Sequence, residues 1–415
     1  MISNLKAKLR TISSNSPSSS KTGPIQGELD RGDLGGSIIE GASGSFVLKT
    51  TSYSLATSYG DVCLDRLKSL DLSDSQWWTR LDQDIDTRDI VFLDTETTGL
   101  AGGTGTLAFL VGIGYLKGDR LVVRQYLARD FDEELPMLEA VTKELSNFKI
   151  LVTFNGKSFD WPLLESRLVY SRLRPIAWED SHLDLLYIAR RLWGRKLKTC
   201  SLTSLEENVL SHYRTGDIPG YMVPEIYRAY LETRRPTDML AVMDHNQSDI
   251  LAMAALLIHI GGLFKDPIKS CDPWELFGVA RDLERSLRLD QACDCYKYCI
   301  KGAKDSNLQL QAKKQLAYLL KRYKGPEAAL GLWRLMADEE SGQLIFPLIE
   351  MAKYLEHREK DFDTALLYTK RALEILDKGL AGYSARIKDD LIKRKNRLLK
   401  KKKGRERNGT YRRIV

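Results

Sequence analysis

Two acidic residues in the stretch "FLDTETTGLAGGTGT" could do chemistry together. Asp94 and Glu96 follow the apolar run "IVFL", which is typical of a buried strand. Residues i and i+2 of a strand point to the same face, and their α-carbons lie about 6.6 Å apart. Two like charges at that spacing cost energy unless a cation holds them. Taken alone the pair could be surface acids at a strand end, but the buried run before Asp94 favours a cation site.

The glycines that follow these acids suggest a second chemistry, a loop that cradles phosphate. A phosphate loop of the Walker type ends in Lys followed by Ser or Thr and leads into a helix. The stretch "GLAGGTGTLAF" has neither residue and leads into apolar residues typical of a strand. The glycines are therefore predicted to form a turn between two strands.

Two further acids lie at positions where they could join the first pair. Asp160 is predicted in the first turn of a helix that follows a buried strand, with Asn155 in the loop between them. Asp249 comes four residues after His245, so the two lie on one helical face. The chain has only five His. A single His–Asp pair is nevertheless more typical of a helix cap or a buried hydrogen bond.

The four acids form a set of hard oxygen ligands without Cys, which suits Mg²⁺ or Mn²⁺ better than Zn²⁺. Two such ions, about 3.5–4 Å apart, can activate a water and stabilise a leaving oxygen. His245, with a reference pKa of about 6.5, could take the proton from that water. The chemistry that this set indicates is phosphodiester hydrolysis.

Three motifs carry a resemblance to a known family. "FLDTETTGL", "FNGKSFDWPLL" and "HNQSD" occur in the order typical of the DEDD 3′–5′ exonuclease superfamily, whose members have a ribonuclease H-like fold. The similarity covers roughly residues 89–262. The spacing of "HLDLLYIARRLWGRKLKTCSLTSLEE" and the helical repeats after it resemble the YprB-type ribonuclease H-like proteins.

This resemblance implies roles for particular residues. Metal binding would fall to Asp94, Glu96, Asp160 and Asp249. Thr98 and Leu100 would contact the 3′-terminal nucleotide, Asn155 would support the second motif, and Asp184 would be a structural or supporting acid. The His-type branch of the superfamily has its His five residues before the last Asp, whereas His245 stands four before, the spacing of the Tyr-type branch. We expect His245 to be the general base.

The elements around the motifs indicate a mixed sheet. "DIVFLDTE" is expected to be a strand, and "LAFLVGIGYLKGDRLVVRQYLA" two strands joined by a hairpin at "KGDR". Helical and strand patterns then alternate. The predicted fold is an α/β ribonuclease H-like mixed sheet, with three antiparallel strands, then parallel strands, and helices on both faces.

The C-terminal third is predicted to be all helical and weakly repetitive. Small residues recur at spacings of 37 and 36 residues, at Ala292, Ala329 and Ala365. At the +4 position stand Tyr296, Trp333 and Thr369, and at the +7 position Cys299, Met336 and Ala372. This period is typical of stacked helix hairpins and resembles tetratricopeptide repeats. An unrelated helical bundle is the alternative.

Five segments follow from these patterns. We expect a mostly disordered segment (1–43), a strand and helix arm (44–87), the ribonuclease H-like exonuclease domain (88–263), the repeats (264–380) and a basic helical or disordered tail (381–415). From Lys393 onward the chain has twelve Lys and Arg and one Glu, a charge of +11. Since the whole chain carries +7, the rest carries −4. The tail is either merely solvated or attracted to a polyanion such as nucleic acid.

Neither a secretory signal nor a membrane-spanning run is evident, so a cytoplasmic location without membrane contact is expected. "CDCYKYC" is interpreted as free thiols on one helix rather than a soft-metal site.

The leading functional prediction is a metal-dependent 3′–5′ exonuclease that uses two Mg²⁺ or Mn²⁺ ions on single-stranded DNA or RNA ends. A protein partner on the repeats is a further expectation. One alternative is a catalytically weak nucleic-acid-binding or scaffold protein of the same fold. The other is a ribonuclease H-like endonuclease.

Overall fold

The structure is a computed structural model that describes residues 34–70, 86–99, 105–178, 180–338, 344–378 and 385–411. The chain divides into two compact units, Met1–Asp266 and Pro267–Val415. Leu100 and most of the glycine-rich loop lie outside the described residues, as does the segment 1–33.

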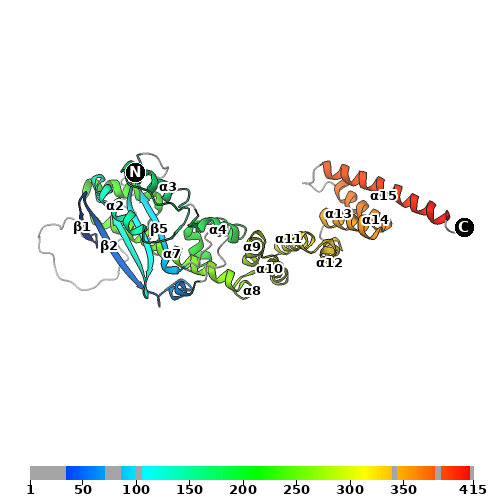
Figure 1. Cartoon of the computed structure of the whole chain (residues 1–415), viewed down its shortest axis with the longest axis horizontal. Coiled ribbons are helices and arrows are strands. Elements are labelled where there is room, and N and C mark those ends of the chain that lie inside the picture. The colour runs from blue at the N-terminus through cyan, green and yellow to red at the C-terminus, as the bar shows by residue number, and fades with distance from the viewer. Residues whose placement is uncertain are drawn as a thin grey trace. The chain divides into compact units, whose positions relative to one another are not determined.

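A seven-stranded mixed sheet forms the centre of the first unit (Figure 1). Its order is β1-β2-β7-β6-β5-β8-β9. The strands are β1 (Ser37–Gly41), β2 (Gly44–Ser54), β5 (Ile90–Thr97), β6 (Ala108–Lys117), β7 (Arg120–Leu127), β8 (Ile150–Thr153) and β9 (His182–Asp184). A separate small ribbon pairs β3 (Ser58–Tyr59) with β4 (Val62–Cys63). The meander β5-β6-β7 is antiparallel, whereas β8 and β9 run parallel to β5, as predicted. The glycine-rich stretch leads into β6, a strand, as expected.

Strand β5 extends beyond its parallel neighbour. β8 pairs with β5 only over Ile90–Phe92, whereas β6 pairs with β5 from Val91 to Thr97. The C-terminal half of β5 therefore has an edge that no strand covers, and other groups must satisfy its backbone hydrogen bonds there.

Helices cover both faces of the sheet, which confirms the prediction. They are α2 (Glu134–Leu145), α3 (Asp160–Tyr170), α4 (Leu185–Trp193), α5 (Leu202–Asn208), α6 (Val223–Thr233) and α7 (Pro236–Lys265). On one face, Val91 and Leu93 of β5 share a core with α2 and α3. On the other face, residues of β6 and β7 such as Phe109 share a core with α6 and α7. Because side chains alternate along a strand, Asp94 and Glu96 point to the α7 side.

Among the described residues, α7 is the one helix long and apolar enough to cross a membrane. Of its apolar 18-residue window, 72% is buried inside the protein. Residues such as Met239 and Val242 pack against the sheet. Packing as a central core helix therefore accounts for this composition.

The N-terminal strands belong to the sheet rather than to a separate arm. β2 pairs with β7 from Val47 to Ser54, and β1 pairs with β2. The sequence predicts an arm at 44–87 because "GSFVLKTTSYSLA" is typical of a strand or hairpin, and such a local pattern does not indicate which strand it pairs with. Its inward residues Phe46 and Val47 are buried in the two cores of the unit.

The second unit is all helical in its described residues. It consists of α8 (Pro267–Ser270), α9 (Pro273–Arg285), α10 (Leu289–Gly302), α11 (Ser306–Tyr323), α12 (Pro326–Asp338), α13 (Ile345–Tyr354), α14 (Phe362–Asp377) and α15 (Ala385–Tyr411). Consecutive helices from α9 to α15 pack on one another. The nine repeat positions fall on α10, α12 and α14, and all are buried. This burial agrees with stacked hairpins, and the tetratricopeptide assignment stays a prediction. Every cysteine of "CDCYKYC" is a buried free thiol on α10.

The basic tail forms α15, which packs against α14. Leu391 and Leu398 on one face of α15 are buried. On the same side, Arg397 Nε and Lys401 Nζ lie 2.7 and 2.8 Å from the carboxylate of Glu356, and Arg394 also pairs with it. The Glu356 side chain is 0% exposed. These ion pairs with one buried acid therefore help to hold α15 against the rest of the unit.

Replacing Glu356 by Gln should loosen α15. Burial alone would raise the pKa of Glu356, but its bonds to Arg397 and Lys401 and the charge of Arg394 lower the pKa to about 2. Without the carboxylate, three cations lose their counter-charge, at a cost of about 1–3 kcal/mol. We expect faster hydrogen exchange across Leu391–Leu398 at pH 7 than in the control Glu374→Gln, which alters an exposed acid of α14.

The effect should depend on pH in one direction. Because the pKa of Glu356 is lower in the folded protein than the ordinary 4.5, its stabilisation is present above about pH 4.5 and is lost as the pH falls towards 2. The difference between the two variants should therefore shrink at pH 3. Equal protection of α15 in both variants at pH 7 would contradict the anchoring role.

Candidate active site

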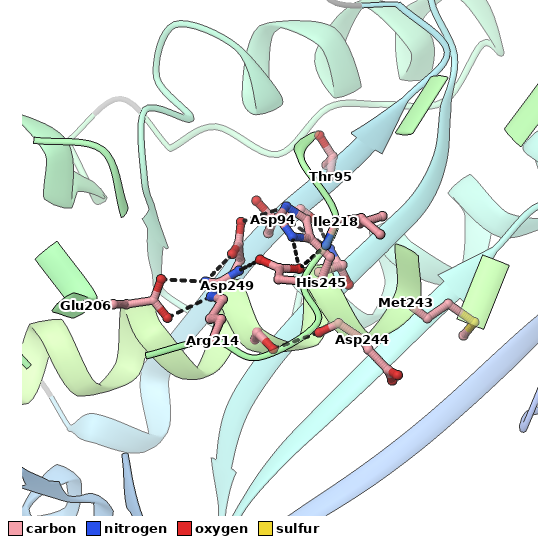
Figure 2. Close-up of polar contacts among 12 residues, drawn as sticks. Asp94, Thr95, Glu206, Arg214, Ile218, Met243, Asp244, His245 and Asp249 are labelled. Carbon is pink, nitrogen blue, oxygen red and sulfur yellow. Dashed lines mark hydrogen bonds and ion pairs between the residues drawn. The ribbon is translucent and has the colours of Figure 1, made fainter. Parts of the chain in front are cut away.

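The candidate site lies at the C-terminal end of β5, on the α7 side of the sheet. Figure 2 shows Asp94 on β5 facing His245 and Asp249, which come from α7. Electrostatic repulsion links Asp94 with Glu96, Asp160 and Asp249, so the four acids act on one another. The four acids thus lie near enough to interact electrostatically, although they come from three separate segments.

Asn246 of α7 holds Asp94 in place. Its Nδ2 donates to the Asp94 carboxylate at 2.8 Å, and its Oδ1 accepts a hydrogen bond from Gln125 at 2.9 Å. Asn246 is fully buried. Gly112 of β6 pairs with Asp94 in the sheet, and a Cβ atom there would lie 2.3 Å from Asn246 Oδ1. Glycine at 112 therefore makes room for the amide that orients Asp94.

Asp160 reaches the site through the uncovered edge of β5. Its Oδ1 accepts hydrogen bonds from the backbone N–H of Thr95 at 3.1 Å and from the Thr95 hydroxyl at 2.6 Å. Since β8 ends its pairing before this point, the carboxylate takes the place of a strand. This contact fixes the first turn of α3 against the end of β5.

Asp249 has a buried cationic neighbour that the sequence analysis missed. Arg214 Nη2 lies 2.5 Å from Asp249 Oδ1 and 2.8 Å from Glu206 Oε2, and its Nη1 lies 3.1 Å from Asp217 (Figure 2). Glu206 on α5 is itself hydrogen-bonded to the hydroxyl of Tyr59. This chain of contacts fixes the orientation of Asp249.

His245 is oriented by a second missed residue. Its Nδ1 lies 2.7 Å from Asp217 Oδ1, and its Nε2 lies 3.9 Å from Asp249 Oδ2. The four-residue spacing thus places His245 beside the acids, on the same face of α7 as Asp249. With Nδ1 held by Asp217, the Nε2 atom is the one that faces the cluster.

The acids carry strongly altered pKa values. Removal from water is the largest cause, followed by mutual repulsion, and it raises the pKa of Asp94 well above its ordinary value. Removal from water also raises the pKa of Glu96, which the charge of His245 only partly offsets, to about 8. For Asp160 the same cause outweighs the hydrogen bonds from Thr95 and raises the pKa to about 6. Added positive charge at this place would stabilise the ionised acids.

The pKa values of the basic groups are also raised, in their case by the nearby carboxylates and against the effect of burial. Burial alone would lower the pKa of His245, but the bond to Asp217 and the charges of Asp249 and Glu96 raise it to about 9. Likewise Asp249 and Glu206 raise the pKa of Arg214 although burial opposes it. His245 and Arg214 are therefore the cations that partly compensate the acids.

The donor chemistry of the site fits a hard divalent cation, because the candidate ligands are carboxylate oxygens and these acids outnumber the cations beside them. Their present contacts are with protein groups, however: Asp94 with Asn246, Asp160 with Thr95, and Asp249 with Arg214. Within the residues that the structure describes, no three of these side chains converge as a set of metal ligands.

The remaining predicted residues have structural contacts. Asn155 adopts a left-handed φ of 67°, and its N–H donates to Asp184 at 2.8 Å. Asp184 also accepts from the backbone of Lys157 and Leu186, so it shapes the loop after β8 and caps α4. The Thr98 hydroxyl accepts from the N–H of Leu107.

Three residues of the site escaped the sequence analysis. Asn246 lies inside "HNQSD" but was given no role there, although the glycines of "LVGIGY" were a signal that a helix approaches this strand closely. Arg214 and Asp217 lie in the irregular segment between α5 and α6, where no periodicity indicates which way a side chain points.

Gly112→Ala should destabilise the first unit by about 1–3 kcal/mol, since the new methyl group collides with the buried Asn246 amide. The matched control is Gly262→Ala on α7, where a Cβ atom would meet nothing within 4 Å. Helix propensity predicts that this control is neutral or stabilising by roughly 0.5–1 kcal/mol. Denaturant unfolding followed by circular dichroism gives both values. A Gly112→Ala midpoint equal to that of the control would refute the close approach.

Comparisons with known proteins show the family of the chain. Residues 91–260 match the family described as RNase_H superfamily. The chain is 33% identical over 288 residues to the uncharacterized protein YprB of Bacillus subtilis (strain 168), a match that covers 68% of this chain and 69% of YprB. Among solved structures, the family B DNA polymerase from the hyperthermophilic archaeon Pyrobaculum calidifontis is similar over 50% of this chain and 29% of its own, with 15% identity and a TM-score of 0.33. The chain belongs to the ribonuclease H superfamily and to the same family as YprB.

Proposed function

We propose that the protein is a divalent-metal-dependent 3′–5′ exonuclease that hydrolyses phosphodiester bonds at single-stranded DNA or RNA ends. The observation that carries the proposal is the meeting of Asp94, Glu96, Asp160 and Asp249 beside His245. The order of the three motifs favours exonuclease action, and membership of the ribonuclease H superfamily supports a nuclease.

The four acids would hold Mg²⁺ or Mn²⁺. When bound, such cations supply neutralisation of the phosphate charge and a lower pKa for the attacking water. Asn246 would keep the Asp94 carboxylate turned towards them. Asp249 would have to share its charge with Arg214, which holds it in the structure.

Cations that neutralise Asp249 and Glu96 would lower the pKa of His245 from about 9, because those charges raise it, and the neutral Nε2 would then take the proton of the attacking water. Asp217 would stabilise the resulting imidazolium through its contact with Nδ1. Thr98, Leu100 and Asn155 would contact the terminal nucleotide, and the family resemblance is the basis for this assignment.

A binding or scaffold protein is the second candidate. It is favoured by the present contacts of Asp94, Asp160 and Asp249, each of which already has a protein partner. A protein of that kind would bind nucleic acid and leave it intact.

Asp94→Asn should reduce hydrolysis at least roughly a thousandfold, because it removes one charge from the ligand set and keeps the shape of the side chain. The assay follows 5′-labelled single-stranded DNA and RNA with Mn²⁺. The control is Asp244→Asn, a neighbouring exposed acid of α7, which should cut like the wild type.

The pattern of products separates the candidates. A ladder of successively shorter products supports the exonuclease. A single internal cut points to a ribonuclease H-like endonuclease, and intact substrate under all conditions points to the binding protein. Equal activity of wild type and Asp94→Asn would remove these acids from the mechanism.

His245→Gln should lower the rate by roughly 10²–10⁴-fold if His245 is the general base. Asp217→Asn should lower it by less, since it weakens the orientation of the ring but leaves the ring in place. Near-normal activity of His245→Gln, together with an inactive Asp94→Asn, would separate the base assignment from the metal assignment.

A further inference from the structure

A cleft of about 660 Å³ opens beside the candidate active site. Asp94 and Asp249 line part of it. The cleft continues past Phe154 and Asn155, at the end of β8, towards α4 and the segment 194–202. Its volume falls within the usual range of about 300–1,000 Å³ for ligand sites.

The lining of the cleft also includes two cations. Arg190 is on α4, and Lys198 is on the segment that follows this helix. Both side chains are exposed. Neither has an ion pair or side-chain hydrogen bond with another described residue. Acidic and basic groups therefore line the same cleft.

Apolar side chains also line the cleft, among polar ones. Leu186, one helical turn before Arg190, lines the cleft together with Leu197 and Leu202. The half-buried ring of Phe154 also lines it. Apolar and aromatic groups beside cations are the combination that binds single-stranded nucleic acid, in which bases contact the former and phosphates the latter.

Two unpaired cations at this place have an electrostatic reason. The acid cluster repels any polyanion that approaches it, since several carboxylates lie together there. A strand whose end is to reach the acids therefore needs favourable contacts for its other phosphates nearby. Arg190 can bind a phosphate through two parallel N–H groups, and Lys198 acts as a point charge.

We propose that Arg190 and Lys198 form a binding subsite for the phosphodiester backbone of a single strand, next to the phosphate that reaches the acids. The direction of the bound strand rests on the proposed function, because the strand terminus is placed at the acids. Binding alone is enough to test the subsite, so the test does not depend on hydrolysis.

The experiment measures fluorescence anisotropy of 5′-fluorescein-labelled oligothymidylate and oligouridylate with the full chain in EDTA, over a series of salt concentrations. The variants are Arg190→Gln, Lys198→Gln and the double substitution. The matched controls are Arg228→Gln on α6 and Lys143→Gln on α2, two exposed cations away from the cleft.

Each single variant should reduce the slope of log K against log salt by about 0.7, and the double variant by about 1.4, because each removes one phosphate contact. Binding by the double variant should also be roughly tenfold weaker at low salt. The controls should keep the wild-type slope and affinity. Unchanged circular dichroism spectra verify that the variants are folded.

A double variant with the slope and affinity of the controls would overturn the subsite, as would a wild type that binds neither oligonucleotide. These outcomes are separate from the fate of the proposed enzyme. If the wild type cuts strand ends while the double variant binds like the controls, the nuclease stands without this subsite. If the double variant binds weakly with the lower slope while the wild type cuts nothing, the subsite stands without the exonuclease.

Discussion

The first unit depends on one electrostatic constraint, the gathering of several carboxylates at the end of β5 with too few cations to match them. Removal from water and mutual repulsion raise the pKa of Asp94 and Glu96. Every close neighbour acts against that cost: an amide at Asn246, a hydroxyl and N–H at Thr95, and a guanidinium at Arg214. A protein would hardly retain such a cluster for stability alone, because buried unmatched charge is among the most costly features of a fold.

The same constraint shapes elements that do no chemistry. α7 must lie close enough to the sheet for Asn246 to reach Asp94, and glycines at 112 and 114 of β6 leave the space for this approach. β8 must stop pairing early enough for Asp160 to bond to the edge of β5. The early end of the β8 pairing and the glycines at 112 and 114 thus follow from where the acids lie.

The sequence predicts those site residues that lie in regular strands and helices, and it does not predict those in irregular segments. Asp94 and Glu96 can be recognised because charged side chains directly after a buried apolar run cost folding free energy unless they have a function. His245 and Asp249 can be recognised because their four-residue spacing places them on one helical face. The roles of Arg214 and Asp217 could not be predicted, because their segment has no regular period. Their partners Asp249 and His245 lie on α7, far along the chain. The anchoring of α15 was hidden for a similar reason: it depends on Glu356, one acid among many whose burial only the packed helices reveal. The mixed sheet was predictable because its strands differ clearly in hydropathy from their loops, whereas the membership of β1 and β2 depends on long-range pairing that local pattern does not encode.

Net charge therefore gives little guidance to where a polyanion would bind. The tail has a net charge of +11 against −4 for the rest of the chain. Even so, Arg394, Arg397 and Lys401 contact Glu356, and Lys402 pairs with Asp363. In the first unit, Arg214 is likewise committed to internal acids. The cations that matter for a ligand are those beside a cleft that have no ion-pair partner. Among the residues that the structure describes, Arg190 and Lys198 meet that condition in the cleft that Asp94 and Asp249 also line. Their number is small, but a phosphate close to an uncompensated cation gains more than one near a cation already neutralised by a carboxylate.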